Sequence, residues 1–150
     1  MITLIRATNS QTVYQIVQET IKTVYPKYYP SGAVSFFLTL HSETSLKAAL
    51  DSEEIYLLEV DNVVVGTGSI RGNEICRLFI LPKYQGRGYG SKLMDLLEEK
   101  IYKDYLEVKA DASFPAESIY LKRGYQILSY EMIETDNKDF LCYHTMVKRK

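Results

Sequence analysis

A glycine-rich segment at residues 85–90 (Gln-Gly-Arg-Gly-Tyr-Gly) has the residue types and spacing of an anion-binding turn. An apolar run over residues 75–81 precedes it and indicates a buried strand. Apolar residues at helical spacing follow it: Leu93, Met94, Leu97 and Ile101. Glycines at the start of that helix leave its first amide N–H groups uncovered. These donors, together with the positive end of the helix dipole, suit a phosphate-like anion.

Three kinds of phosphate-binding turn compete for this segment. A Walker loop needs Gly-Lys-Ser/Thr, and the order Gly90-Ser91-Lys92 excludes it. The dinucleotide pattern G-x-G-x-x-G needs a glycine where the chain has Ser91, so it fits weakly. The third pattern, Q/R-x-x-G-x-G/A between a strand and a long helix, is matched by Gln85, Gly88 and Gly90. A plain connecting turn is the alternative, although such a turn seldom needs three glycines.

The chain resembles the GCN5-related N-acetyltransferase (GNAT) superfamily in three features: this pattern, the preceding L-F-I-L-P of residues 78–82, and the amphipathic helix that follows. The resemblance implies acetyl-coenzyme A as cofactor, with its pyrophosphate on the glycine-rich turn. The cofactor-binding residues that it implies are Leu78, Phe79, Ile80, Gln85, Gly86, Arg87, Gly88, Tyr89, Gly90, Ser91, Ser113 and Tyr120. Ser113 stands where the family commonly has an asparagine, which leaves the role of that residue open.

The resemblance also implies groups that act on the thioester. In this family the strand before the turn bulges. A backbone N–H of that strand, which aligns with Leu78, donates to the thioester carbonyl. A further amide, which aligns with Ile80, contacts the pantetheine arm. Residues 119–125 (Ile-Tyr-Leu-Lys-Arg-Gly-Tyr) resemble the family segment F-Y-E-K-x-G-F. That match makes Tyr120 the proton donor to the departing sulfur, since a phenol pKa lies near that of a thiol. The alternative is a tyrosine that only packs one helix face.

An amine acceptor must lose a proton before it attacks. An alkylamine has a pKa near 10, so only about a thousandth of it is neutral at pH 7, and a carboxylate or a water relay must take the proton. Glu74 lies four residues before Leu78, on the same face of the strand, where the histone-acetyltransferase branch of the family has its general base. The alternative is that Glu74 only closes a turn at Gly72-Asn73.

Aromatic residues gather in the segment 25–32, between prolines. Tyr25, Tyr28 and Tyr29 are predicted to bind the acceptor through ring packing or cation–π contacts. The alternative is that these rings only cover the end of the sheet.

Length and composition limit the remaining classes. The chain of 150 residues suits one domain, 1–150. A net charge of −1 argues against a nucleic-acid partner. No apolar run near 18 residues suggests a membrane span, and the N-terminus lacks the basic region of a signal peptide. Two distant cysteines and two distant histidines predict no metal site and a cytoplasmic protein with reduced thiols.

Periodicity and turn residues predict the elements in order. Strands are expected at 2–7, 55–60, 63–70, 75–81, 105–110, 125–134 and 140–147, and helices at 11–25, 33–40, 45–50, around 93–101 and at 116–122. Ser10 is the expected N-cap of the first helix, and residues 61–62 and 136–138 the expected hairpin turns. The order β-α-α-βββ-α-β-α-ββ resembles the GNAT fold, an α/β (α+β) fold with a mixed, mostly antiparallel sheet of about seven strands and helices on both faces.

The sequence therefore favours an acetyl-coenzyme A-dependent N-acetyltransferase that acts on a primary amine by direct attack in a ternary complex. The acceptor would be a small molecule, a polyamine, or a peptide or protein amine. A non-catalytic acyl-coenzyme A sensor is the alternative from another class. A homodimer is suggested only by analogy with the family.

Overall fold

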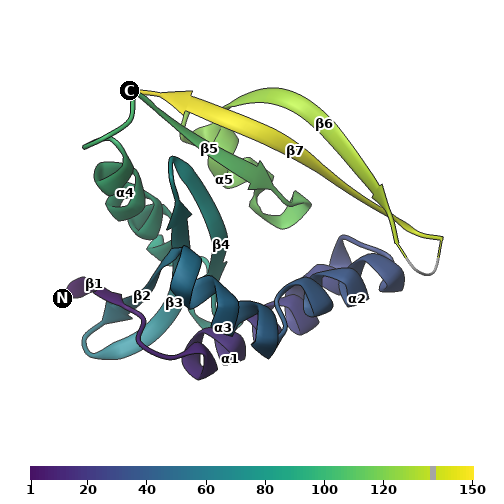
Figure 1. The fold of residues 1–150 in the computed structure, drawn as a ribbon, viewed down its shortest axis with the longest axis horizontal. Helices are drawn as coiled ribbons and strands as arrows, with labels where there is room; N and C mark the ends of the chain where they lie inside the picture. The colour runs from purple at the N-terminus through teal and green to yellow at the C-terminus, as the bar shows by residue number, and fades with distance from the viewer. Residues whose placement is uncertain (136–137) are drawn as a thin grey trace.

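The computed structural model describes residues 1–135 and 138–150 as a seven-stranded sheet with helices on both faces (Figure 1). The strands are β1 (Ile2–Arg6), β2 (Glu54–Val60), β3 (Val63–Arg71), β4 (Glu74–Ile80), β5 (Glu107–Ala112), β6 (Gln126–Glu134) and β7 (Phe140–Arg149). The helices are α1 (Ser10–Val24), α2 (Ser31–Leu40), α3 (Glu43–Ser52), α4 (Tyr89–Ile101) and α5 (Phe114–Lys122), with short 3₁₀ helices η1 (Tyr25–Lys27) and η2 (Pro82–Tyr84). The predicted fold class is confirmed, and three helices, α1 to α3, separate β1 from β2 where the predicted order β-α-α-βββ has two.

The sheet consists of two antiparallel parts joined by one short parallel contact. Its strand order is β1-β2-β3-β4-β5-β7-β6. Strands β4 and β5 pair only at Glu74↔Lys109 and Ile75↔Ala110, and beyond these residues they diverge, as Figure 1 shows. All other neighbouring strands pair along most of their length in antiparallel register. The sheet is therefore parted in its middle, next to the glycine-rich turn.

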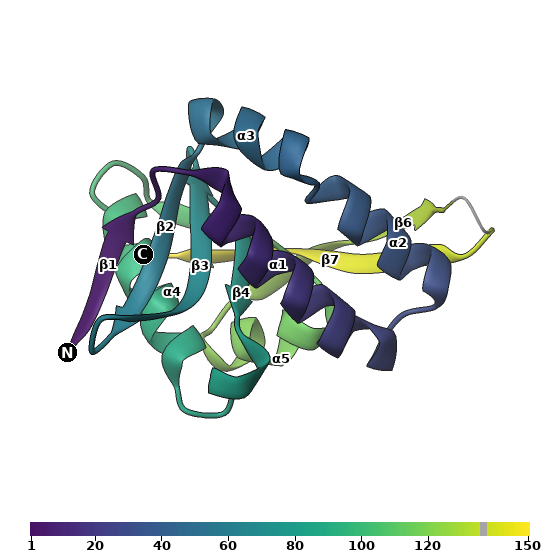
Figure 2. The ribbon, with the colours of Figure 1, turned by 90° about the horizontal axis from the view of Figure 1, so that it is seen from below.

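Two apolar clusters hold helices against the opposite faces of the sheet. Helix α4 buries Leu93, Leu97 and Ile101 against β3, β4 and β5. Gly68 permits this close approach, because a Cβ there would lie 2.7 Å from the Leu97 Cδ1 atom. On the other face lie α1, α2 and α3 (Figure 2). They bury a second cluster around Val13 and Ile21. The parted middle of the sheet thus lies between two packed layers of helices.

Several predicted boundaries need correction. The N-cap of α1 is Asn9 and not Ser10, because the extended Asn9 accepts hydrogen bonds from the amides of Gln11 and Thr12. Strand β5 begins two residues later than predicted, since the Tyr105 amide still donates to the Ile101 carbonyl at the end of α4.

The predicted turns have mixed outcomes. Asp61 and Asn62 both have positive φ, as the hairpin prediction requires. In the second predicted turn, residues 136 and 137 lie outside the described residues. None of the helices in the described part of the chain combines the length and hydropathy of a membrane span.

Candidate active site

Strand β4 contains a bulge next to the point where it leaves β5. Its register with β3 shifts between Thr67 and Ser69, and Arg77 has φ +50°, which is unusual for a residue other than glycine. The Arg77 guanidinium is ion-paired with Glu53, and the two side chains are only 13% and 6% exposed. The Glu53 carboxylate also accepts a hydrogen bond from the Ser69 hydroxyl, at 3.2 Å. A buried ion pair therefore lies under the bulge that presents Leu78.

The glycine-rich turn leads into α4 with its first amides uncapped. Gly88 is the N-cap residue, with φ +82°, and no side chain among residues 1–135 and 138–150 caps this helix start. A Cβ at Gly88 would meet no atom of the described residues within 4 Å, apart from its chain neighbours, so the missing side chain leaves open space above the turn. The Gln85 amide group donates to the Ile80 carbonyl, at 2.9 Å, and ties the turn to the end of β4. These residues fit an anion such as a pyrophosphate.

Arg123 is hydrogen-bonded to the first turn of α4 and to its middle. Its guanidinium donates to the Ser91 hydroxyl at 3.0 Å and to the Glu98 carboxylate at 2.7 Å. Burial opposes the charged form of Glu98, but hydrogen bonds from Arg123 and Tyr125 leave its pKa below the usual value. Gly124 follows with φ +90°, and the Tyr125 amide donates to the Tyr120 carbonyl, so Gly124 ends α5 as a helix-terminating glycine.

A first cavity of about 520 Å³ runs from the glycine-rich turn to the parted strands. Residues of η1, β4, the turn, α4 and α5 line it. They include Tyr25, Tyr28, Leu78, Phe79, Ile80, Gln85, Gly86, Gly88, Tyr89, Gly90, Ser91 and Ser113. This cavity has the size of a small-molecule or cofactor site and contacts both the uncapped amides and the bulged strand.

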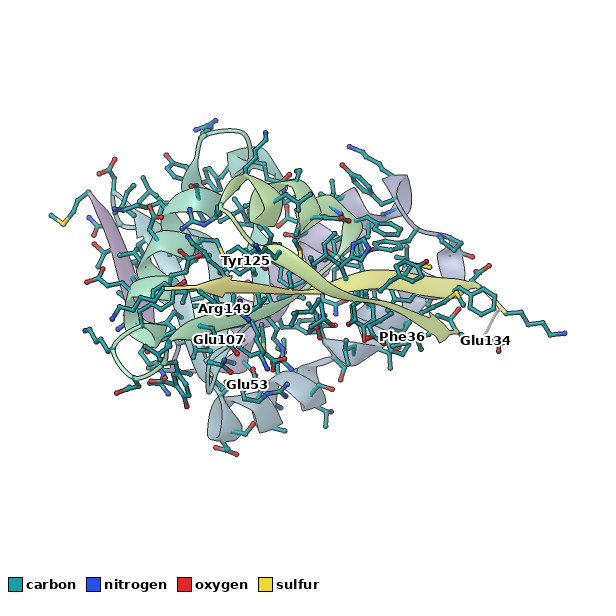
Figure 3. All side chains as sticks on the ribbon, turned by 90° about the horizontal axis from the view of Figure 1, so that it is seen from above. Phe36, Glu53, Glu107, Tyr125, Glu134 and Arg149 are labelled. Atoms are coloured by element: carbon teal, nitrogen blue, oxygen red, sulfur yellow. The ribbon has the colours of Figure 1, made fainter. Side chains whose placement is uncertain are left out.

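A second cavity of about 390 Å³ lies on the side of the sheet covered by α1, α2 and α3. Figure 3 labels two of its lining residues, Phe36 of α2 and Glu53 at the end of α3. The two cavities share five lining residues, which are Tyr25, Leu78, Phe79, Ser113 and Ala116. The gap between β4 and β5 thus connects the two cavities.

Tyr120 lies beside this junction and lines the second cavity. Its side chain is 3% exposed, and burial raises the pKa of its phenol well above the ordinary value. The phenol is therefore protonated throughout the neutral range and is a hydrogen-bond donor. No described side chain is hydrogen-bonded to its hydroxyl.

The three predicted acceptor-site tyrosines occupy different places. Tyr25 is buried at the junction, and its hydroxyl lies 3.4 Å from the Ser113 hydroxyl. Tyr28 is exposed at the edge of the first cavity. Tyr29 is buried against Phe114, with the rings stacked 5.1 Å apart, and its hydroxyl accepts a hydrogen bond from the Phe114 amide. Only Tyr25 of the three lines both cavities.

The other predicted site residues are also brought near the two cavities. Glu74 lines the second cavity, where the Arg71 guanidinium donates to its carboxylate at 2.9 Å. Arg87 lies on the turn, with its guanidinium 5.9 Å from the centre of the Tyr84 ring.

The second cavity contains polar residues that the sequence did not single out. Asp111 of β5 and Tyr143 of β7 line it beside Glu74. His41, at the end of α2, lines it with an Nδ1 atom that is buried and has no hydrogen-bond partner among the described residues. Burial, and secondarily the charge of Arg77, lowers the pKa of His41 to about 4. In β5, polar and apolar residues alternate, and this alternation could have placed Asp111 on the polar face of the strand. No local sequence pattern indicates that His41 lines the cavity.

Comparison with known proteins agrees with this geometry. A family described as "Acetyltransferase (GNAT) domain" matches residues 24–150. No curated protein sequence matches the chain. A solved GCN5-related N-acetyltransferase, titled "Aminotransferase, Class-II", from Rhodopseudomonas palustris superimposes with a TM-score of 0.89 at 24% identity, over 99% of this chain and 95% of that one.

Two further solved structures contain the cofactor. PaiA N-acetyltransferase of Thermoplasma acidophilum, in complex with coenzyme A, has a TM-score of 0.74 at 20% identity, over 100% of this chain and 99% of that one. A GNAT family acetyltransferase of Elizabethkingia anophelis, with acetyl-CoA bound, has a TM-score of 0.67 at 16% identity, over 99% and 98%. These likenesses show a shared fold. The family match, which covers most of the sequence, shows that this chain belongs to the GNAT acetyltransferase domain family.

Proposed function

We propose that the chain is a single-domain N-acetyltransferase that moves an acetyl group from acetyl-coenzyme A to a primary amine. The observation that carries this proposal is the pair of cavities that meet at Leu78 and Ser113 in the parted sheet. One cavity offers uncapped helix amides for a pyrophosphate, and the other offers a separate space for an acceptor. Two reactants bound in them would meet at the junction in one ternary complex.

The first cavity is the proposed cofactor site. The amides at the start of α4, with Gly86 and Gly88 bare of side chains, would hold the pyrophosphate. Backbone groups of Leu78 and Ile80, with the Ser113 hydroxyl, would hold the pantetheine arm. When bound, acetyl-coenzyme A supplies an activated acetyl thioester. Its presence among solved structures of the same fold supports this choice of cofactor.

The acceptor ammonium loses one proton to the protein, and its nitrogen forms a bond to the acetyl carbon while the carbon–sulfur bond breaks. The second nitrogen proton is released as the amide forms, and the sulfur leaves as the protonated thiol. The Leu78 amide is the proposed donor to the carbonyl oxygen, and the Tyr120 phenol the proposed donor to the sulfur. Glu74 is the proposed route by which the first proton reaches solvent.

A covalent acetyl-cysteine route is less well supported. Cys76 lines the second cavity, but burial, with help from Glu53 and Glu74, raises the pKa of its thiol to about 11. Such a thiol is almost entirely protonated at neutral pH and is a poor nucleophile. Direct attack by the amine therefore fits these residues better.

Thiol release from acetyl-coenzyme A with a panel of amines tests the proposal. Tyr120→Phe should lower kcat about a hundredfold, because it removes a general acid, while the Kd of coenzyme A stays within threefold. Tyr105→Phe is the matched control, since this exposed tyrosine lies outside both cavities and should leave both values unchanged.

Two results would contradict the proposal. Coenzyme A binding without turnover of any amine would favour the non-catalytic sensor. An unchanged kcat in Tyr120→Phe would remove the phenol from the reaction.

A further inference from the structure

The second cavity has a charged half and an apolar half. The charged half contains Glu53, Arg71, Glu74, Arg77 and Asp111. The apolar half contains Phe36, Phe37, Leu40, Ile133 and Leu141. This division bears on the identity of the acceptor, and the inference drawn from it rests on the proposed function.

The carboxylates of the charged half differ in their partners. Glu53 is ion-paired with Arg77, and Glu74 accepts a hydrogen bond from Arg71. Asp111 accepts one hydrogen bond, at 3.2 Å, from the hydroxyl of Thr145. In the described part of the chain no ion pair joins Asp111 to a basic side chain. Asp111 is therefore the carboxylate of this cavity whose charge is left for a ligand.

The charges that face Asp111 come from three strands. Glu74 of β4 and Glu131 of β6 are negative, and Arg71 of β3 is positive. The Asp111 side chain is exposed, and its partial desolvation raises its pKa above the ordinary value; the charge of Glu74 raises the pKa further, and Glu131 adds to this. A cation placed here would relieve the repulsion among these carboxylates.

Asp111 also lies closer to the junction of the cavities than Glu74 does. It follows Ala110, the last residue of β5 that pairs with β4, and precedes Ser113 by two residues, or about 7 Å of extended chain. Glu74 lies within the paired part of β4 and precedes Leu78 by four residues, or about 13 Å. An amine at the junction would therefore meet the Asp111 carboxylate first.

The apolar half is built to contact a ring or another compact apolar group. The ring of Phe37 lies 4.7 Å from that of Tyr25, edge to face, and 6.4 Å from that of Phe36. His41 lines the same cavity, is 8% exposed, and has an Nδ1 atom without a partner among the described residues. The volume of about 390 Å³ suits a small molecule.

We propose that Asp111 binds the ammonium group of the acceptor, and that the acceptor is a small primary monoamine with an apolar, ring-bearing body, such as an arylalkylamine. The ammonium gives one proton to a carboxylate oxygen of Asp111, and the proton then passes toward Glu74 and solvent. The neutral nitrogen uses its lone pair for the new bond to carbon. The body of the acceptor packs against the rings of Phe36 and Phe37.

The first test uses two matched carboxylate-to-amide variants of the same cavity. With 2-phenylethylamine as acceptor, Asp111→Asn should raise the KM of the amine at least tenfold, and the Kd of coenzyme A should stay within twofold. Glu74→Gln, which interrupts the proposed proton route, should lower kcat but change the KM of the amine by less than threefold. An effect of Asp111→Asn no larger than that of Glu74→Gln would overturn the assignment.

The second test compares acceptors and does not depend on the Asp111 variant. The wild type should have a kcat/KM for 2-phenylethylamine at least tenfold above those for spermidine and ethanolamine. Phe36→Ala should lower the value for 2-phenylethylamine about tenfold and leave that for ethanolamine within twofold.

The outcomes of the second test separate the two proposals. Turnover that is equal for all three amines, or fastest with spermidine, would overturn this inference while the acetyltransferase proposal stands. The absence of turnover with every amine would overturn both.

Discussion

Replacing Arg77 by methionine should destabilise the protein by about 3 kcal/mol, because it leaves the Glu53 carboxylate buried without its main partner. Methionine keeps an unbranched apolar stem and removes the guanidinium. Breaking a buried ion pair from one side costs roughly 3–5 kcal/mol. Arg71 lies 4.0 Å from the same carboxylate and remains as a weak substitute, so the low end of this range applies.

Urea unfolding followed by far-UV circular dichroism measures this loss, and tyrosine fluorescence is a second probe because the chain has 13 tyrosines and no tryptophan. For a chain of this length, 1 kcal/mol shifts Tm by roughly 2–4 °C, so Arg77→Met should lower Tm by about 6–12 °C. The double variant with Glu53→Gln removes the unpaired charge. It should be at least about 1.5 kcal/mol more stable than the sum of the single effects predicts.

Two results would refute this reasoning. A loss below about 1 kcal/mol in Arg77→Met would mean that the pair is effectively solvated. Additivity of the two single effects to within roughly 0.5 kcal/mol would mean that the two side chains are not coupled.

Two further predictions concern the turn and the buried histidine. Gly88→Val should weaken coenzyme A binding more than a hundredfold by calorimetry, because the side chain would enter the open space above the turn at φ +82°. Gly90→Ala is the control: its Cβ would meet Ile80 at an ordinary 3.7 Å, so its affinity should stay within fivefold of the wild type. Equal affinities of the two variants for coenzyme A would contradict the placement of the pyrophosphate on this turn. His41 has a folded-state pKa of about 4, below the ordinary 6.5, so its contribution to stability is present above pH 6.5 and is lost as the pH falls toward 4. Between pH 6.5 and 4, the free energy of unfolding of the wild type in urea titrations should fall by about 3 kcal/mol from this source, and His41→Phe should not show this loss. Parallel plots of unfolding free energy against pH for the two proteins would contradict the prediction.

The sequence predicts most of the fold because its signals are local. Short apolar runs mark β2 and β3, and helical spacing marks α4. The first N-cap was wrong because Asn9 and Ser10 are both good caps, and only the backbone conformation decides between them. Strand β5 was predicted too early because Tyr105 and Leu106 are apolar but exposed.

The phosphate turn and the acceptor cavity differ in how far the sequence reveals them. The turn depends on glycines at fixed spacing, which is a local pattern. The bulge depends on an arginine with positive φ, and nothing in its residue type predicts that conformation. Asp111 and His41 come to one cavity from distant segments because the sheet parts between β4 and β5. Such a meeting is a property of the tertiary fold and leaves no mark in sequence spacing.

A crystal structure of the protein with coenzyme A bound tests the central claim most directly. We expect pyrophosphate oxygens within about 2.7–3.2 Å of amides at the start of α4, and the sulfur between Leu78 and Tyr120 at the junction of the two cavities. A ligand bound elsewhere on the surface, or a pyrophosphate held by side chains away from residues 85–91, would contradict it.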